Sequence, residues 1–274
     1  MYKNKIGVIY QLKEALENGI KNLIELDINS VQLQCFSPEL LTQENAKKVK
    51  KIMLDSGIEI SSFWAGWTGP NVWNLTEGPE TLGLVPEKYR EHRYQELLKG
   101  VDFASWLGVK SVATHVGFIP ETPDNKLYQG TLAVLKNLVD YCTSKNVCFN
   151  FETGQETPDT LMNIINDINT PYYTGISFDP ANLIIYGKGN PTEAIDTFGK
   201  YIKEVHIKDA DYSSVPNEMG CEQVVGEGQV NFSVFLPKLL NQGYTGNLYI
   251  EREIQGEQKN IDIKNTVTYI RKFL

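Results

Sequence analysis

Short apolar runs alternate with amphipathic helical stretches along almost the whole chain, and this alternation limits the possible folds more than any other feature. The strand-like runs are residues 6–10, 30–35, 58–63, 110–114, 147–151, 174–178, 204–208 and 247–250. The clearest helical stretches are residues 12–26, 42–56, 89–107, 127–144, 157–168, 232–242 and 259–273. Strands that alternate with helices form a parallel sheet covered by helices. Because the strands number eight, we predict a single α/β domain over residues 1–274, a (β/α)8 TIM barrel.

Length and composition agree with this prediction. The chain has 274 residues, close to the roughly 250 of a typical TIM barrel. Its formal charge of -8 argues against a nucleic acid as the main partner, because a phosphate backbone requires a basic surface. Four cysteines without a C-x-x-C pair indicate reduced thiols. We see no signal-peptide pattern and no apolar run of about 18 residues, so we expect a cytoplasmic protein without a membrane span.

Four residues of metal-ligand type lie at the carboxyl ends of predicted strands. Glu152, Asp179 and Glu251 each directly follow an apolar run, and His206 lies within the run 204–208. In a parallel barrel these ends meet on one open face, where active sites of this fold are built. Taken alone, each carboxylate would be interpreted as a surface residue and the histidine as a satisfied core residue. Four equivalent positions together favour a divalent-metal site, and therefore an enzyme.

The residues around His206 support the same prediction. Side chains alternate along a strand, so His206 and Lys208 should point toward the barrel axis. A buried imidazole or ammonium is costly without a partner; a metal for His206 and a substrate oxygen for Lys208 would remove that cost. Three carboxylates and one imidazole, with no thiolate, suit Mn²⁺, Co²⁺, Mg²⁺ or Fe²⁺. We favour Mn²⁺ and leave Zn²⁺ open.

Two connections are longer than ordinary βα loops. The segment 64–87 follows the third strand and carries Trp64, Trp67 and Trp73, and the segment 209–231 follows the seventh. Long connections in compact domains are often lids or binding loops. We expect the tryptophan segment to be a lid with Trp64 nearest the substrate; a packed surface insertion is the alternative. Gly226 and Gly228 make a weak candidate for a phosphate-binding turn.

Several motifs carry a family resemblance that runs through nearly the whole chain. They are the segments 104–108, 114–117, 150–152, 179–183, 205–209, 226–232 and 243–246, the last followed by Glu251. In order and spacing the sequence resembles the xylose-isomerase-like TIM-barrel superfamily, in particular its sugar and sugar-phosphate isomerases and epimerases such as ketose 3-epimerases. The resemblance implies that Glu152, Asp179, His206 and Glu251 bind one catalytic metal.

The resemblance also implies a mechanism and a small carbohydrate substrate. The metal would polarise a ketose carbonyl and stabilise an enediolate, while Glu152 and Glu251 would remove and return the proton. Epimerisation and aldose–ketose isomerisation both remain open, as do free and phosphorylated substrates and assembly into a homo-oligomer. An inosose-type dehydratase with the same metal site and a non-catalytic sugar-binding barrel are the alternatives.

The chain also departs from some relatives. Apurinic-site endonucleases of this superfamily use a histidine-rich trinuclear zinc cluster, whereas this chain has three histidines. It carries Asn182 where those nucleases and some ketose epimerases have a histidine. DNA repair is therefore disfavoured, and we expect Asn182 to bind a substrate hydroxyl or its own loop.

Two further predictions concern neighbouring residues. His115 at the end of the fourth strand should contact the substrate. Arg90, His92 and Arg93 begin a helix, and we expect them to form a solvated helix face rather than a phosphate site.

Overall fold

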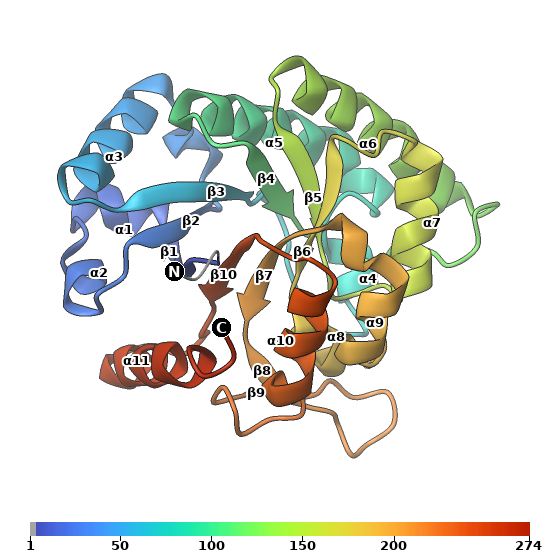
Figure 1. Ribbon diagram of the computed structural model, residues 1–274. Coiled ribbons are helices and arrows are strands. Elements are labelled where there is room, and N and C mark those ends of the chain that lie inside the picture. The colour runs from blue at the N-terminus through green and yellow to red at the C-terminus, as the bar shows by residue number, and fades with distance from the viewer. Residues whose placement is uncertain (1–3) are drawn as a thin grey trace.

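The computed structural model describes residues 4–274, which form a closed barrel of eight parallel strands surrounded by helices (Figure 1). The barrel strands are β1 (Ile6–Gln11), β2 (Ser30–Cys35), β3 (Glu59–Ala65), β4 (Ser111–Thr114), β5 (Cys148–Glu152), β6 (Thr174–Phe178), β7 (Ile202–Ile207) and β10 (Asn247–Ile250). Their order around the barrel is β1-β10-β7-β6-β5-β4-β3-β2, so β1 and β10 close the ring. The predicted TIM-barrel architecture is confirmed.

The helices cover the outside of the barrel (Figure 1). They are α1 (Leu12–Glu17), α2 (Lys21–Glu25), α3 (Gln43–Asp55), α4 (Gly78–Thr81), α5 (Glu87–Leu107), α6 (Lys126–Ser144), α7 (Pro158–Ile168), α8 (Pro180–Ile185), α9 (Pro191–Phe198), α10 (Phe232–Asn241) and α11 (Glu257–Ile270), with 3-10 turns at Pro38–Leu40 and Gly199–Tyr201. No helix in the span 4–274 is both long and apolar enough to cross a bilayer.

Two helical regions differ from the predictions. The single helix predicted over residues 12–26 is divided into α1 and α2, because Gly19 between them adopts a positive φ of 76° that a continuous helix cannot contain. The helices α8 and α9 were not predicted. Each has a proline in its first turn and an Asp or Asn side chain that caps its N-terminus, Asp179 for α8 and Asn190 for α9, which are standard start signals.

The barrel strands bury two different kinds of surface. Outward side chains pack against the helices: Phe63 lies 5.1 Å from Phe103 of α5, and Phe178 lies 4.9 Å from Phe198 of α9, between ring centroids. Inward side chains are largely polar and contact one another across the barrel. They include Gln32, Ser62, Asn150, Ser177, Glu204 and His206, all buried. This polar interior lies directly beneath the open face that carries the predicted ligands.

Both long connections leave the barrel at that face. The strand β3 extends through Ala65, so Trp64 belongs to the strand rather than to the loop that follows. The first long connection contains α4, and the second contains a small antiparallel pair, β8 (Asp209–Asp211) and β9 (Cys221–Gln223).

Candidate metal centre

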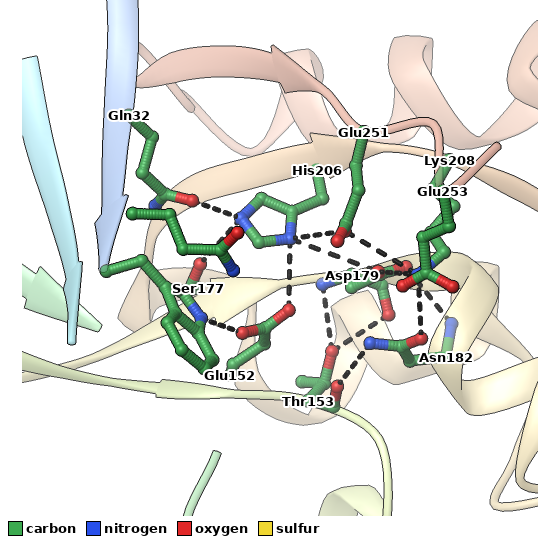
Figure 2. Close-up of polar contacts among 12 residues, drawn as sticks. Gln32, Glu152, Thr153, Ser177, Asp179, Asn182, His206, Lys208, Glu251 and Glu253 are labelled. Atoms are coloured by element: carbon green, nitrogen blue, oxygen red, sulfur yellow. Dashed lines mark hydrogen bonds and ion pairs between the residues drawn. The ribbon is translucent and has the colours of Figure 1, made fainter. Parts of the chain in front are cut away.

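The barrel brings the four predicted ligands to one point (Figure 2). Glu152 is the last residue of β5, Asp179 caps α8 directly after β6, His206 lies in β7 and Glu251 directly follows β10. One ligand atom from each residue lies within 4.8 Å of all the others. Asp179 and His206 are fully buried, and the Glu251 side chain is 15% exposed. The arrangement therefore offers three carboxylate oxygens and one imidazole nitrogen to a single ion.

The imidazole of His206 presents its two nitrogens to different surroundings. Its Nδ1 lies 3.1 Å from Glu152 Oε1, 3.2 Å from Glu251 Oε2 and 3.9 Å from Asp179 Oδ2. Its Nε2 lies 2.8 Å from Oε1 of Gln32, a neutral amide on the opposite wall of the barrel. Nδ1 is therefore the nitrogen that faces the carboxylates.

Three atoms of this cluster lack hydrogen bonds. Asp179 Oδ2, Glu251 Oε2 and His206 Nδ1 are buried. Within the described residues, none of the three has a partner at hydrogen-bonding geometry. Leaving polar atoms buried and unpaired costs free energy. A divalent cation bound among them would satisfy all three at once. The residues thus fit a metal that prefers oxygen and imidazole ligands.

The electrostatics of the cluster also suit a cation. Burial raises the pKa of Glu152, but His115 and His206 more than offset it, so the net pKa is below the ordinary value. Burial likewise raises the pKa of Glu251, and Lys208 and His206 reverse the shift. Burial lowers the pKa of His206, yet Glu152 and its neighbours hold that pKa well above normal. Glu152 and Glu251 are therefore ionised, and they stabilise positive charge at the position of Nδ1.

Lys208 belongs to the same charge cluster (Figure 2). Its buried Nζ lies 2.8 Å from Glu253 Oε1 and 3.7 Å from both Asp179 Oδ2 and Glu251 Oε2. Burial lowers the pKa of Lys208, but these carboxylates raise it well above its ordinary value. The ammonium partly neutralises two of the candidate ligands. Its predicted contact with a substrate oxygen stays a prediction.

Asn182 holds the loop that positions Asp179. The backbone N–H of Asn182 donates to Asp179 Oδ1 at 3.0 Å, and its side-chain amide donates to the carbonyl of Thr153 at 3.3 Å. Thr153 Oγ1 in turn accepts from the Asp179 N–H at 2.9 Å. These bonds match the second of the two roles expected for Asn182. They leave Asp179 Oδ2 free for an ion, while a substrate contact of Asn182 stays a prediction.

A cavity of about 840 Å³ opens above the cluster, within the usual size range of small-molecule sites. Glu152, Glu251, Lys208 and Asn182 line one part of it, and aromatic side chains line another: Phe36, Trp64, Trp73, His115 and Tyr186. Trp64 Nε1 donates a hydrogen bond to Glu152 Oε2, and His115 Nε2 lies 3.4 Å from Glu152 Oε1. The predicted substrate residues Trp64 and His115 therefore lie beside the candidate ligands.

Comparison with known proteins identifies the family. A sequence profile described as the xylose isomerase-like TIM barrel matches residues 20–272. The chain belongs to the xylose isomerase-like TIM barrel family. A xylose isomerase domain protein from Planctomyces limnophilus is 31% identical, with a TM-score of 0.91 over 98% of this chain and 96% of that one.

More distant solved structures share the barrel of the xylose isomerase-like family. A D-tagatose 3-epimerase-like protein is 23% identical, with a TM-score of 0.73 over 98% of each chain. A xylose isomerase-like protein from Mycobacterium smegmatis, solved in complex with magnesium, is 16% identical, with a TM-score of 0.73 over 100% of this chain and 98% of that one. At these identities the similarity establishes the fold alone.

In this family member the tryptophan segment is anchored by a buried arginine, so the prediction of a solvated helix face was wrong for Arg93. Its guanidinium stacks 4.1 Å from the Trp67 ring and donates to three loop carbonyls, those of Thr68 (3.1 Å), Pro70 (2.7 Å) and Gly83 (2.8 Å). Arg90 similarly donates to the carbonyl of Leu84 at 2.8 Å. His92 alone is exposed as expected. These contacts could not be predicted from the sequence, because every residue has a backbone carbonyl and a carbonyl acceptor therefore leaves no sequence pattern.

The turn around Gly226 and Gly228 is not an open phosphate-binding turn. The Asp209 carboxylate accepts the backbone N–H groups of Gly226 at 2.9 Å, Gly228 at 3.1 Å and Val230 at 3.0 Å. A Cβ on Gly228 would lie 2.4 Å from Asp209 Oδ1, so glycine is needed for this close approach. The turn thus binds a carboxylate of its own chain.

Sequence reasoning missed several residues near the candidate metal centre of this xylose isomerase-like barrel. Gln32 contacts His206, and Glu253 pairs with Lys208. Trp73, which was expected in the lid segment, lies 5.1 Å from His115 between ring centroids. One signal was available for Gln32, since it and Gln34 are polar residues at alternate positions of a predicted strand, with the apolar Val31 before them and Leu33 between them. That spacing points both side chains to the barrel interior.

Proposed function

We propose that the protein is a divalent-metal-dependent isomerase or epimerase of a sugar or sugar phosphate. The observation that carries this proposal is the convergence of four ligand atoms within 4.8 Å, from residues in or directly after four different barrel strands. Membership of the xylose isomerase-like family and the fold shared with an epimerase-like protein support it. The magnesium complex of one structural neighbour supports a hard divalent ion; we favour Mn²⁺ for this chain.

The proposed chemistry is proton transfer at a carbon next to a carbonyl. A bound divalent ion would polarise that carbonyl and make the neighbouring C–H bond more acidic. Glu152 and Glu251 have lowered pKa values, because nearby cationic groups outweigh the effect of burial. Both are therefore ionised near neutral pH, so one can accept the proton from the carbon and release it to water, while the other takes up a proton from water and donates it to the carbon.

The surrounding residues would hold the substrate and exclude water. Trp64 fixes Glu152 through its indole N–H, and aromatic rings offer flat surfaces to the C–H face of a sugar. Glu152 and Glu251 reach His206 Nδ1 from different directions (Figure 2). Proton transfer on two faces of one carbon gives an epimer, and we favour that outcome over isomerisation.

Deuterium exchange tests the proposal directly. The Mn²⁺-loaded protein would be incubated in D2O with paired free ketoses and ketose phosphates, the metal would be removed, and the products would be read by NMR. We expect deuterium at a carbon next to the carbonyl, together with an epimer. A deoxy or unsaturated product would instead indicate a dehydratase. If none of the sugars incorporated deuterium, the protein would be a binding protein.

Matched variants assign the exchange to the candidate site. Glu152→Gln and Glu251→Gln retain the size of the side chain but cannot carry the proton, so each should lose most of the exchange. Glu257→Gln changes an exposed carboxylate on α11 and should exchange like the parent protein. Parent-like exchange by both site variants would contradict the proposed roles.

A further inference from the structure

We propose that Gln32 is a positioning residue that fixes the tautomer of His206 and so directs Nδ1 as a metal ligand. This inference rests on the metal site of the proposed function. It adds a requirement that the four ligands alone do not supply: the imidazole must keep its proton on Nε2.

The contact between the two side chains is buried and well defined. Gln32 and His206 are both fully buried, and Gln32 Oε1 lies 2.8 Å from His206 Nε2. The strands β2 and β7 are not neighbours in the barrel, so the bond spans its interior (Figure 2). The other end of the amide is also held, because Gln32 Nε2 donates to Ser62 Oγ at 3.4 Å. This second bond keeps the carbonyl oxygen of Gln32 turned toward the imidazole.

The direction of the bond determines where the proton lies. An amide oxygen accepts hydrogen bonds and cannot donate them, so Nε2 must carry a proton to bond with Gln32. An imidazole that binds a metal is neutral and has one N–H, which leaves the lone pair on Nδ1, the nitrogen that faces the carboxylates. Without Gln32, the carboxylates would favour a proton on Nδ1 instead. That tautomer cannot bind a metal through Nδ1.

Ser177 is the other polar neighbour of this nitrogen, with its Oγ 3.4 Å from His206 Nε2. A hydroxyl either donates or accepts, so it is compatible with both tautomers and selects neither. Gln32 is therefore the group near Nε2 that selects between them. Partners of the second ring nitrogen commonly tune metal-binding histidines in this way.

The first test measures Mn²⁺ affinity by calorimetry, with the metal alone as the probe. Gln32→Leu should bind Mn²⁺ about 10–100-fold more weakly, the usual effect of losing such a partner. Gln32→Glu keeps an acceptor at the same place and should restore the affinity. Gln34→Leu is the matched control: it lies on the same strand, pairs with Gln11 and has no contact with His206 among the hydrogen bonds of residues 4–274. It should bind like the parent.

The second test observes the tautomer in the unmodified protein, so it does not depend on any variant folding. With Mg²⁺ bound, ¹⁵N NMR of His206 should show the proton on Nε2 and none on Nδ1. A proton on Nδ1 in that complex, or parent-like Mn²⁺ affinity in Gln32→Leu, would overturn the inference about Gln32 but not the proposed function. A parent protein that binds neither ion would overturn the proposed function as well.

Discussion

The inner and outer faces of the barrel strands differ sharply in chemistry. In β5, Phe149 and Phe151 point outward and pack against each other with ring centroids 5.0 Å apart. Asn150 between them points inward and donates to Ser111 Oγ at 2.5 Å and to Glu204 Oε1 at 3.2 Å. Barrel interiors are usually filled by layers of Val, Ile and Leu. Here the outer face supplies the apolar core, and the inner face supplies hydrogen bonds beneath the site.

The two faces make different energetic contributions. Burying an apolar side chain contributes about 1.5–3 kcal/mol, whereas a hydrogen bond contributes about 0.5–1.5 kcal/mol net. Burial raises the pKa of Glu204, and hydrogen bonds from Ser62 and Asn150 offset only part of that shift. The outer face should therefore determine stability. The inner face should determine the geometry of the metal centre, and the predictions below for His206, Phe149 and Asn150 test that division.

The largest expected effect is the loss of metal in His206→Ala. This change removes the one imidazole from the ligand set, so we expect Mn²⁺ affinity to fall by more than about 100-fold, beyond the effect of a supporting partner. Metal analysis after dialysis measures the occupancy, and circular dichroism checks that the barrel is folded. A full metal complement in this variant would refute the ligand assignment.

On the outer face, Phe149→Ala should cost about 3–5 kcal/mol of unfolding free energy, as is usual when a buried Phe is truncated. Urea unfolding measures the loss. Mn²⁺ affinity under native conditions should stay close to that of the parent, because Phe149 faces the helices. A large loss of affinity in the folded variant would contradict the division between the two faces.

Glu156 provides a pH test, because it is a buried carboxyl group whose neighbours do not offset the effect of burial on its pKa. Burial raises its pKa to about 8, and Lys188 offsets only part of the effect. The folded protein therefore holds this proton more tightly than the unfolded chain does. Stability from this group is present at low pH and declines as pH rises from about 4.5 to about 8. Glu156→Gln should flatten that decline in urea unfolding measured across this range, and an unchanged slope would count against it.

On the inner face, Asn150→Ala should cost about 1–3 kcal/mol, because Glu204 loses a buried hydrogen-bond partner. This loss should be smaller than that of Phe149→Ala in the same urea series. Unlike Phe149→Ala, it should also weaken Mn²⁺ binding slightly, since Glu204 and His206 lie in one strand. If Asn150→Ala lost more unfolding free energy than Phe149→Ala, polar contacts would contribute more to the stability of this barrel than apolar packing.

Much of this molecule could be predicted because strand and helix periodicity are local properties. Gly57, Gly108, Gly243 and Asn146 each follow a helical stretch in the sequence, and all four have positive φ values, 70°, 83°, 87° and 56°, as is typical where a helix ends. The convergence of Glu152, Asp179, His206 and Glu251 was predicted because parallel strands share one carboxyl end. The roles of these residues in metal binding and catalysis stay predictions.

The contacts between distant segments could not be predicted. Gln32 reaches His206 from across the barrel, and Arg93 is buried by a loop that lies before it in the chain. Neither contact leaves a periodic pattern, because each depends on how side chains meet after the barrel closes. The extension of β3 through Trp64 was missed for a similar reason, since pairing with β2 and β4 determines that boundary.

The anchoring of the tryptophan segment by Arg93 has a consequence for protein engineering. The arginine that holds this loop belongs to α5, outside the loop itself. If this loop were transplanted alone into a relative, it would therefore arrive without its anchor, and a host without this arginine would leave the loop's carbonyls unpaired. The exchangeable unit is the loop together with the first two turns of α5, and swaps designed on that unit should preserve the shape of the cavity wall.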